Sequence, residues 1–134
     1  MATRQRQKAE KVAQNADKRP RAIAKNLGVS PSKVRVVLNI IRGKDYKEAL
    51  AILQNMPNVG AEYAVKVLES AGANAENNLG MNKANLYVAE CFADGAAVLK
   101  RFQPVSKGRA HSIKKRTSLF LIKNNCDMAC SLFN

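Results

Sequence analysis

The apolar residues between positions 30 and 79 recur with a helical period in three separate segments. In the first, SPSKVRVVLNIIRG, the apolar positions recur at intervals of three and four residues: Val34, Val37, Leu38 and Ile41. Ser30 and Pro31 are typical of a helix N-terminus, and Gly43 is typical of the position just after a helix. The spacing therefore predicts an amphipathic helix from about residue 31 to residue 42.

Two further helices are predicted by the same periodicity. Asp45 can cap a helix in YKEALAILQNM, and Pro57 ends it. A longer helix is expected from Val59 to Leu79. Gly72 lies inside it and costs about 1 kcal/mol relative to Ala, which indicates that another element approaches closely there.

From Leu86 onward the apolar period changes from that of a helix to that of a strand. The segment LYVAECFA alternates, so one face is expected to carry Leu86, Val88, Glu90 and Phe92. SLFLI (118–122) is expected to form a second apolar strand, and residues 21–29 are expected to form a weak strand or an extended segment. Pro104 and Gly108 lie in the middle of the segment between the two apolar strands and predict a hairpin turn near residues 103–108. Each side of this hairpin would extend about ten residues, or about 33 Å, beyond the core.

These elements predict an α+β fold, in which three helices pack on a small antiparallel sheet with a long protruding β-hairpin. The hairpin should span about residues 95–116 within a single domain, 19–123. Residues 1–18 lack apolar periodicity and are expected to form a disordered basic tail. Residues 124–134 are expected to form a C-terminal tail.

The charge of the chain lies at its two ends. The net charge is +13, and residues 26–97 contribute none of it because their Lys and Arg residues equal their Asp and Glu residues in number. Residues 1–25 contribute +6, and residues 98–134 contribute +7 with Asp127 as the only acid. A neutral body between two cationic segments favours a polyanionic partner, with nucleic acid ahead of a membrane surface.

Several other classes of protein are disfavoured. No run of 18 apolar residues is present, and the N-terminal segment lacks the apolar region of a secretory signal. Three cysteines in such a chain indicate reduced thiols, and Cys126 and Cys130 lack the partners of a zinc site. His111, the only histidine, has no acid nearby, and no motif identifies a Ser or Cys nucleophile for it, so we expect no enzyme, no cofactor and no metal.

Three motifs resemble the bacterial form of the large-subunit ribosomal protein L22 family. They are SPSKVRVVLNIIRGK (30–44), AVKVLESAGANAENN (64–78) and LKRFQPVSKGRAHSIKKRTS (99–118). The resemblance covers about residues 20–122 and implies a body bound to 23S ribosomal RNA with a hairpin that lines the polypeptide exit tunnel. It implies other large-subunit proteins and the nascent polypeptide as partners, no membrane, and a cytoplasmic rather than an organellar ribosome. The chain departs from the family at Leu119, where relatives commonly have His.

By this resemblance Lys107, Gly108, Arg109 and Ala110 lie at or near the hairpin tip, and 114–116 lie on the returning strand. Because the chain has few aromatic residues, contacts to phosphate and to RNA shape are favoured over base stacking. The candidate RNA-binding residues are Arg21, Lys33, Arg35, Arg42, Lys100, Arg101, Lys107, Gly108, Arg109, His111, Lys114, Lys115 and Arg116. The alternative is a DNA-binding helix-turn-helix protein that uses the helix in 30–44, which would leave the cationic hairpin without a clear role.

Overall fold

The structure, a computed structural model, describes residues 2–15, 17 and 19–126. Short 3-10 turns cover Lys83–Asn85 and Ser106–Gly108. In chain order the longer elements are α1 (Ala2–Gln14), β1 (Arg21–Leu27), α2 (Pro31–Ile41), α3 (Tyr46–Gln54), α4 (Val59–Leu79), β2 (Leu86–Gly95), β3 (Leu99–Pro104), β4 (Ala110–Lys115) and β5 (Ser118–Cys126).

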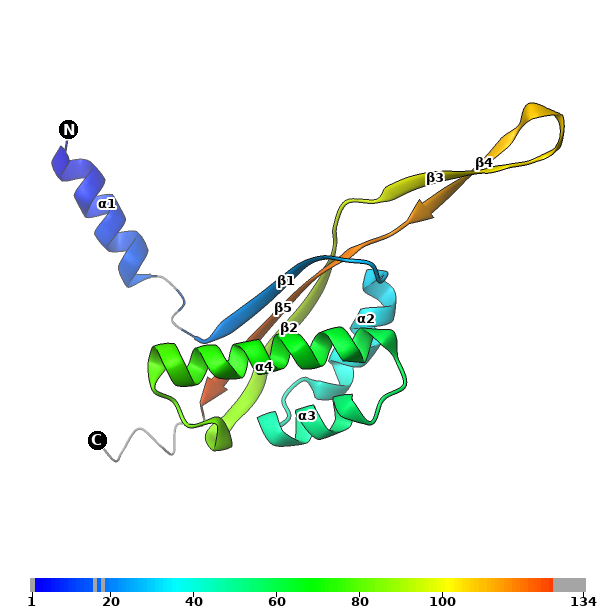
Figure 1. The fold of residues 1–134 in the computed structure, drawn as a ribbon. Coiled ribbons are helices and arrows are strands. Elements are labelled where there is room, and N and C mark those ends of the chain that lie inside the picture. Colours follow the sequence, from blue (N-terminus) through cyan, green and yellow to red (C-terminus); the bar gives the residue numbers. More distant parts are fainter. Residues whose placement is uncertain (1, 16, 18, 127–134) are drawn as a thin grey trace.

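The body of the protein is a three-stranded antiparallel sheet covered on one side by α2, α3 and α4 (Figure 1). Strand β5 lies in the middle, between β1 and β2. Its alternate residues Ser118, Phe120, Ile122 and Asn124 are fully buried, so they face the helices, while the residues between them are half-buried. The expected α+β fold with three helices on a small antiparallel sheet is therefore confirmed.

The helices begin and end close to the predicted positions. The apolar stripe of α2 is fully buried, as are Ala64, Leu68 and Ala71 of α4. Gly43 follows α2 with a φ of 75°, a left-handed conformation that suits glycine. Ser30 and Asp45 occupy the N-cap positions of α2 and α3, but neither side chain makes a capping hydrogen bond.

Gly72 allows close packing between α3 and α4, as the sequence predicts. A Cβ atom built on Gly72 would lie 2.8 Å from Cε2 and from the hydroxyl oxygen of Tyr46. Only a residue without a side chain leaves room for the Tyr46 ring at this point. The half-buried Tyr46 can thus cover the core between the two helices.

Strand β2 differs from its prediction because a β-bulge shifts its alternation. The pairing register with β5 slips between Val88 and Glu90, so Ala89 is the additional residue. After the bulge Cys91 and Ala93 face the core, and Phe92 is 49% exposed on the side without helices. The expectation that Phe92 shares a face with Leu86 and Val88 was therefore wrong, since strict alternation cannot continue through an inserted residue.

The hairpin of β3 and β4, together with residues 105–109 and Arg116, forms an arm that projects from one end of the sheet (Figure 1). It is a separate two-stranded sheet whose residues are all exposed. Where it joins the body, the Ala96 N–H donates to the Thr117 carbonyl at 3.0 Å, and Thr117 Oγ1 donates to the Ala97 carbonyl at 2.6 Å. These bonds fasten the arm to the ends of β2 and β5.

The two ends of the chain differ from what the sequence suggested. Residues Ala2–Gln14 form helix α1, where no regular structure was expected; they contain no Gly or Pro and are rich in good helix formers. Disorder of the expected tail 1–18 in the free protein stays a prediction. Strand β5 continues to Cys126, past the expected boundary at 123, because it pairs with Leu86 and buries Asn124. Residues 127–134 lie outside the described part.

Two observations bear on the excluded protein classes. Among the described residues, no helix combines the length and the apolar character needed to cross a bilayer. Cys91 is buried with a free thiol, which donates to the Leu38 carbonyl at 3.4 Å, and burial raises the pKa of that thiol. Cys126 is also free, and Cys130 lies outside the described residues.

We predict that replacing Asn124 with Val stabilises the protein. Both polar atoms of the fully buried Asn124 amide lack a hydrogen-bond partner in the described structure. Since an unsatisfied buried polar group costs about 1–3 kcal/mol, Asn124→Val should raise the free energy of unfolding by about 1 kcal/mol in urea titrations. Asn125→Val is the matched control: Asn125 Nδ2 donates to the Tyr87 hydroxyl at 3.2 Å, so this change should give no gain. A loss of stability in Asn124→Val would contradict the account.

Candidate nucleic-acid interface

The arm gathers most of the candidate RNA-binding residues on one exposed element. In residues 99–116 there are seven Lys and Arg residues and no Asp or Glu. The structure brings together here Lys100, Arg101, Lys107, Gly108, Arg109, His111, Lys114, Lys115 and Arg116. All of these residues are exposed, so their charges are available to a partner.

The pairing register places like charges opposite each other. Lys100 of β3 pairs with Lys114 of β4, and Leu99 pairs with Lys115. Directly opposed like charges destabilise a β ladder. A lone two-stranded ribbon is in any case marginally stable in water. The arm by itself is therefore weakly stable, and binding of an anion would stabilise it by neutralising the opposed cations.

Both faces of the arm carry cations together with exposed apolar side chains. Residues that pair across the ladder share a face, so Arg101 and Lys115 lie with Ile113 on one side. Lys100 and Lys114 lie with Phe102 on the other side, and Phe102 is 72% exposed. A partner that surrounds the arm could therefore meet cations on either face.

The tip of the arm is a tight turn with two consecutive left-handed residues. Lys107 and Gly108 have φ values of 60° and 69°. The Val105 N–H donates to the Arg109 carbonyl at 2.9 Å and closes the turn. Gly108 adopts this conformation without steric cost, whereas a non-glycine residue such as Lys107 rarely does. Gly108 thus shapes the turn, and Lys107 and Arg109 project their charges from it.

Arg35 of α2 and Arg42, the residue that directly follows α2, contact the edge of the sheet. Arg35 Nε donates to the Ala93 carbonyl at 2.9 Å, and one Arg42 Nη donates to the Cys91 carbonyl at 3.0 Å. Strand β2 is an edge strand, so these carbonyls face away from β5 and have no strand partner beyond them. The two guanidinium groups satisfy that edge and line a cavity of about 170 Å³. Sequence reasoning missed this structural role.

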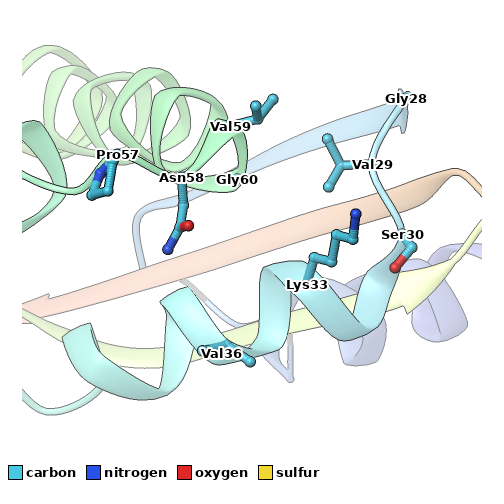
Figure 2. A pocket seen from close by; sticks show the side chains of 9 residues that line it. All are labelled: Gly28, Val29, Ser30, Lys33, Val36, Pro57, Asn58, Val59 and Gly60. Carbon is cyan, nitrogen blue, oxygen red and sulfur yellow. The ribbon is translucent and has the colours of Figure 1, made fainter.

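Lys33 faces a different hollow, between the N-terminal ends of α2 and α4. Figure 2 shows its side chain rising from α2 towards the loop at Val29. The cavity has a volume of about 630 Å³, and Lys33 is its only charged lining residue. Val36 and Val59 add exposed apolar surface. Lys33 therefore has different surroundings from Arg35 and Arg42, although Arg35 lies on the same helix and Arg42 directly follows it.

Arg21 is the remaining candidate, and it lies at the far end of the body from the arm. It pairs with Lys123 in the β1–β5 ladder, whereas the arm leaves the sheet beyond Ser118. The Arg21 carbonyl accepts a hydrogen bond from Asn74 Nδ2 at 3.0 Å, which ties β1 to α4. The candidate residues thus occupy three places: the arm, α2 with the residue that follows it, and the start of β1.

Next to Arg21 lies a group of four ion-paired residues that sequence reasoning missed. We call Asp17, Arg19, Glu90 and Lys123 the clamp. Arg19 pairs with Asp17 at 2.8 Å and with Glu90 at 2.9 Å, and Lys123 Nζ lies 3.0 Å from both carboxylates. The only sequence signal was an acid at position 17 within a cationic segment, and its partners are distant along the chain.

The clamp shifts the ionisation of all four groups. Hydrogen bonds, from Arg19 above all, lower the pKa of Asp17, and those from Lys123 and Arg19 lower the pKa of Glu90. The two carboxylates in turn raise the pKa values of Arg19 and Lys123. All four groups therefore stay charged at neutral pH and hold Asp17 and Arg19 against β2 and β5.

Comparison with known proteins decides the family. A model of the family described as "Ribosomal protein L22p/L17e" matches residues 22–123. The chain belongs to the ribosomal L22 family. Two curated relatives, each named "Large ribosomal subunit protein uL22", come from Clostridium beijerinckii and Clostridium novyi. They are 57% and 54% identical over 98 residues, which make up 73% of this chain and 88% of each relative.

The L22 family match contains the arm, α2–α4 and most of the sheet, while α1 and the clamp residues Asp17 and Arg19 precede it. Nothing in these comparisons supports the helix-turn-helix alternative. Leu119 lies half-buried, opposite Asp94 in the β2–β5 register. Opposed residues share a face of the sheet, so a His side chain at this position would lie beside the Asp94 carboxylate. Leu119 has no polar group with which to form a hydrogen bond to that carboxylate.

We predict that replacing Lys100 with Glu stabilises the arm in the free protein. The carboxylate introduced by Lys100→Glu would face Lys114 and turn an opposed like-charge pair into an attractive pair, worth about 0.2–1 kcal/mol. Amide exchange of 99–115 should slow by about 1.4- to 5-fold. Lys107→Glu is the control, because the turn gives it no cross-strand partner. Equal exchange in the parent and the Lys100→Glu variant would contradict the idea that the cations weaken the arm.

Proposed function

We propose that this L22 family protein is a structural constituent of the large ribosomal subunit that binds 23S ribosomal RNA and lines the polypeptide exit tunnel with its arm. The observation that carries the proposal is the arm itself: seven exposed cations, no acids, and a like-charge pair in its ladder. Such an element requires a polyanion around it, and RNA phosphates supply one.

The shape of the molecule supports different roles for the body, which anchors the protein, and for the tip of the arm, which contacts a distant site. The body carries a conventional core, and its middle segment, 26–97, has no net charge. The arm extends about ten residues, or about 33 Å, from the ends of β2 and β5. Its tip with Lys107 and Arg109 therefore meets surroundings far from those of the body. In the proposed assembly the tip contributes to the tunnel wall and meets the nascent polypeptide.

The proposal assigns a binding and assembly role without catalysis. Other large-subunit proteins are partners of the body, and the protein acts in the cytoplasmic ribosome. Of Lys33, Arg35 and Arg42, only Lys33 has a side chain that makes no hydrogen bond to the β2 edge, so it is the best of the three for an RNA phosphate. Arg35 and Arg42 can reach RNA only with the nitrogen atoms that do not bind the Ala93 and Cys91 carbonyls.

The docking contribution of the arm can be measured from salt dependence. Each neutralised phosphate contributes about −0.7 to −0.9 to the slope of log affinity against log salt concentration. Replacing both Lys114 and Lys115 with Ala should therefore reduce the steepness of this slope by about 1.4–1.8 in filter binding to 23S rRNA. Lys47→Ala with Lys66→Ala removes the same charge from exposed positions of α3 and α4 and should leave the slope unchanged. Equal slopes for the two double variants would contradict docking by the arm.

The tunnel role can be separated from docking by deleting the tip. Removal of 102–110 should leave incorporation into large subunits largely intact, because most cations near the base of the arm remain. The same deletion should alter the response of ribosomes to stalling peptides or to tunnel-binding antibiotics. Subunit incorporation, measured on sucrose gradients, and stalling, measured in translation, are both needed. If the tip deletion abolished incorporation while the Lys114/Lys115 double variant incorporated normally, the proposed roles would be wrong: the tip, and not the base of the arm, would carry the docking.

A further inference from the structure

Helix α1 carries a stripe of cations that the arm and the body do not explain. Arg4, Lys8 and Lys11 are spaced by four and three residues, so they lie on one side of the helix in successive turns. At 1.5 Å per residue the stripe is about 10 Å long. The remaining cation Arg6 lies on another side, one turn from Glu10, the only acid in α1. Three uncompensated positive charges therefore share one side.

The composition of α1 argues against packing on the protein core or on a membrane. Val12 is the only large apolar residue of the helix, and it is 63% exposed. The described side chains of α1 are all exposed. An amphipathic helix that binds a core or a lipid surface needs a continuous apolar face, and α1 has none. Since an isolated helix of this length is marginally stable in water, it needs a partner that acts through charge.

The clamp fixes Asp17 and Arg19, which lie between α1 and β1 in the sequence. Asp17 and Arg19 are held against Glu90 and Lys123, directly before β1 begins at Arg21. In Figure 1, α1 departs from the end of the sheet opposite to the arm. A polyanion that contacts α1 is therefore contacted at a place remote from the arm.

We propose that α1 is a second RNA-binding element, which docks Arg4, Lys8 and Lys11 on the backbone phosphates of a helical segment of ribosomal RNA. The inference rests on the proposed binding of 23S rRNA and adds a contact outside the part of the chain that matches the family. The stripe recognises phosphate spacing and not base sequence, because long cationic side chains on one helix side reach backbone oxygens. RNA neutralises the stripe and stabilises the helix.

The test uses a rearranged full-length variant with unchanged composition and net charge. Exchanging Lys and Gln in Gln5→Lys, Lys8→Gln, Lys11→Gln and Gln14→Lys scatters the cations around α1. Lys and Gln have similar helix propensities, so the helix itself should be preserved. In filter binding to purified 23S rRNA at about 0.1 M salt, loss of two contacts should weaken affinity by roughly 25- to 60-fold and reduce the salt slope by about 1.4–1.8. Amides of 4–14 should gain protection with RNA only in the parent.

Failure of this inference can be told apart from failure of the proposed function. If the rearranged variant binds like the parent, with the same slope, charge alone matters and the stripe is not a site. If the Lys114/Lys115 double variant still shows a reduced slope in that experiment, rRNA binding by the arm stands and only the role of α1 is overturned. If neither variant differs from the parent, both proposals fail. Protection of 4–14 by anionic vesicles but not by 23S rRNA would also overturn the inference.

Discussion

The repulsion between cations along the arm is the constraint on which the rest of the structure depends. In the arm Lys100 lies opposite Lys114, and residues 99–116 contain no Asp or Glu to offset the positive charge. Folding of the arm by itself therefore gains little stability. Its shape must come from a rigid attachment at one end and from neutralisation by a partner along its length. The body supplies the first, and RNA phosphates supply the second in the function proposed here.

The attachment is strong because β2 and β5 are fixed on several sides. Phe120 and Ile122 anchor β5 in the core, and Thr117 bonds both connections to the arm. The free edge of β2 is closed by Arg35, by Arg42 and by the loop after α2, where the Gly43 N–H donates to the Val88 carbonyl at 2.9 Å. Arg35 and Arg42, which the sequence suggests as RNA-binding residues, thus also stabilise the strand from which the arm extends.

Sequence reasoning predicted the features that depend on local patterns. Helical periodicity located α2 and α4, Gly72 indicated a close approach, and Pro104 with Gly108 located the turn. It did not predict the bulge at Ala89, because a bulge has no distinct residue composition. The additional residue nevertheless reverses which of the following side chains are buried. The clamp was also missed, since Asp17 and Lys123 meet only after β1 and β5 have paired.

Amide hydrogen exchange of 99–115, compared between the free protein and the protein in assembled large subunits, tests the central claim most directly. The account predicts rapid exchange along both strands of the arm in the free protein, while Leu68 and its neighbours in α4 remain protected. In the subunit the arm should become protected throughout. Protection of the arm in the free protein equal to that of α4 would show that the cationic ribbon is stable by itself, and would contradict its dependence on a polyanion.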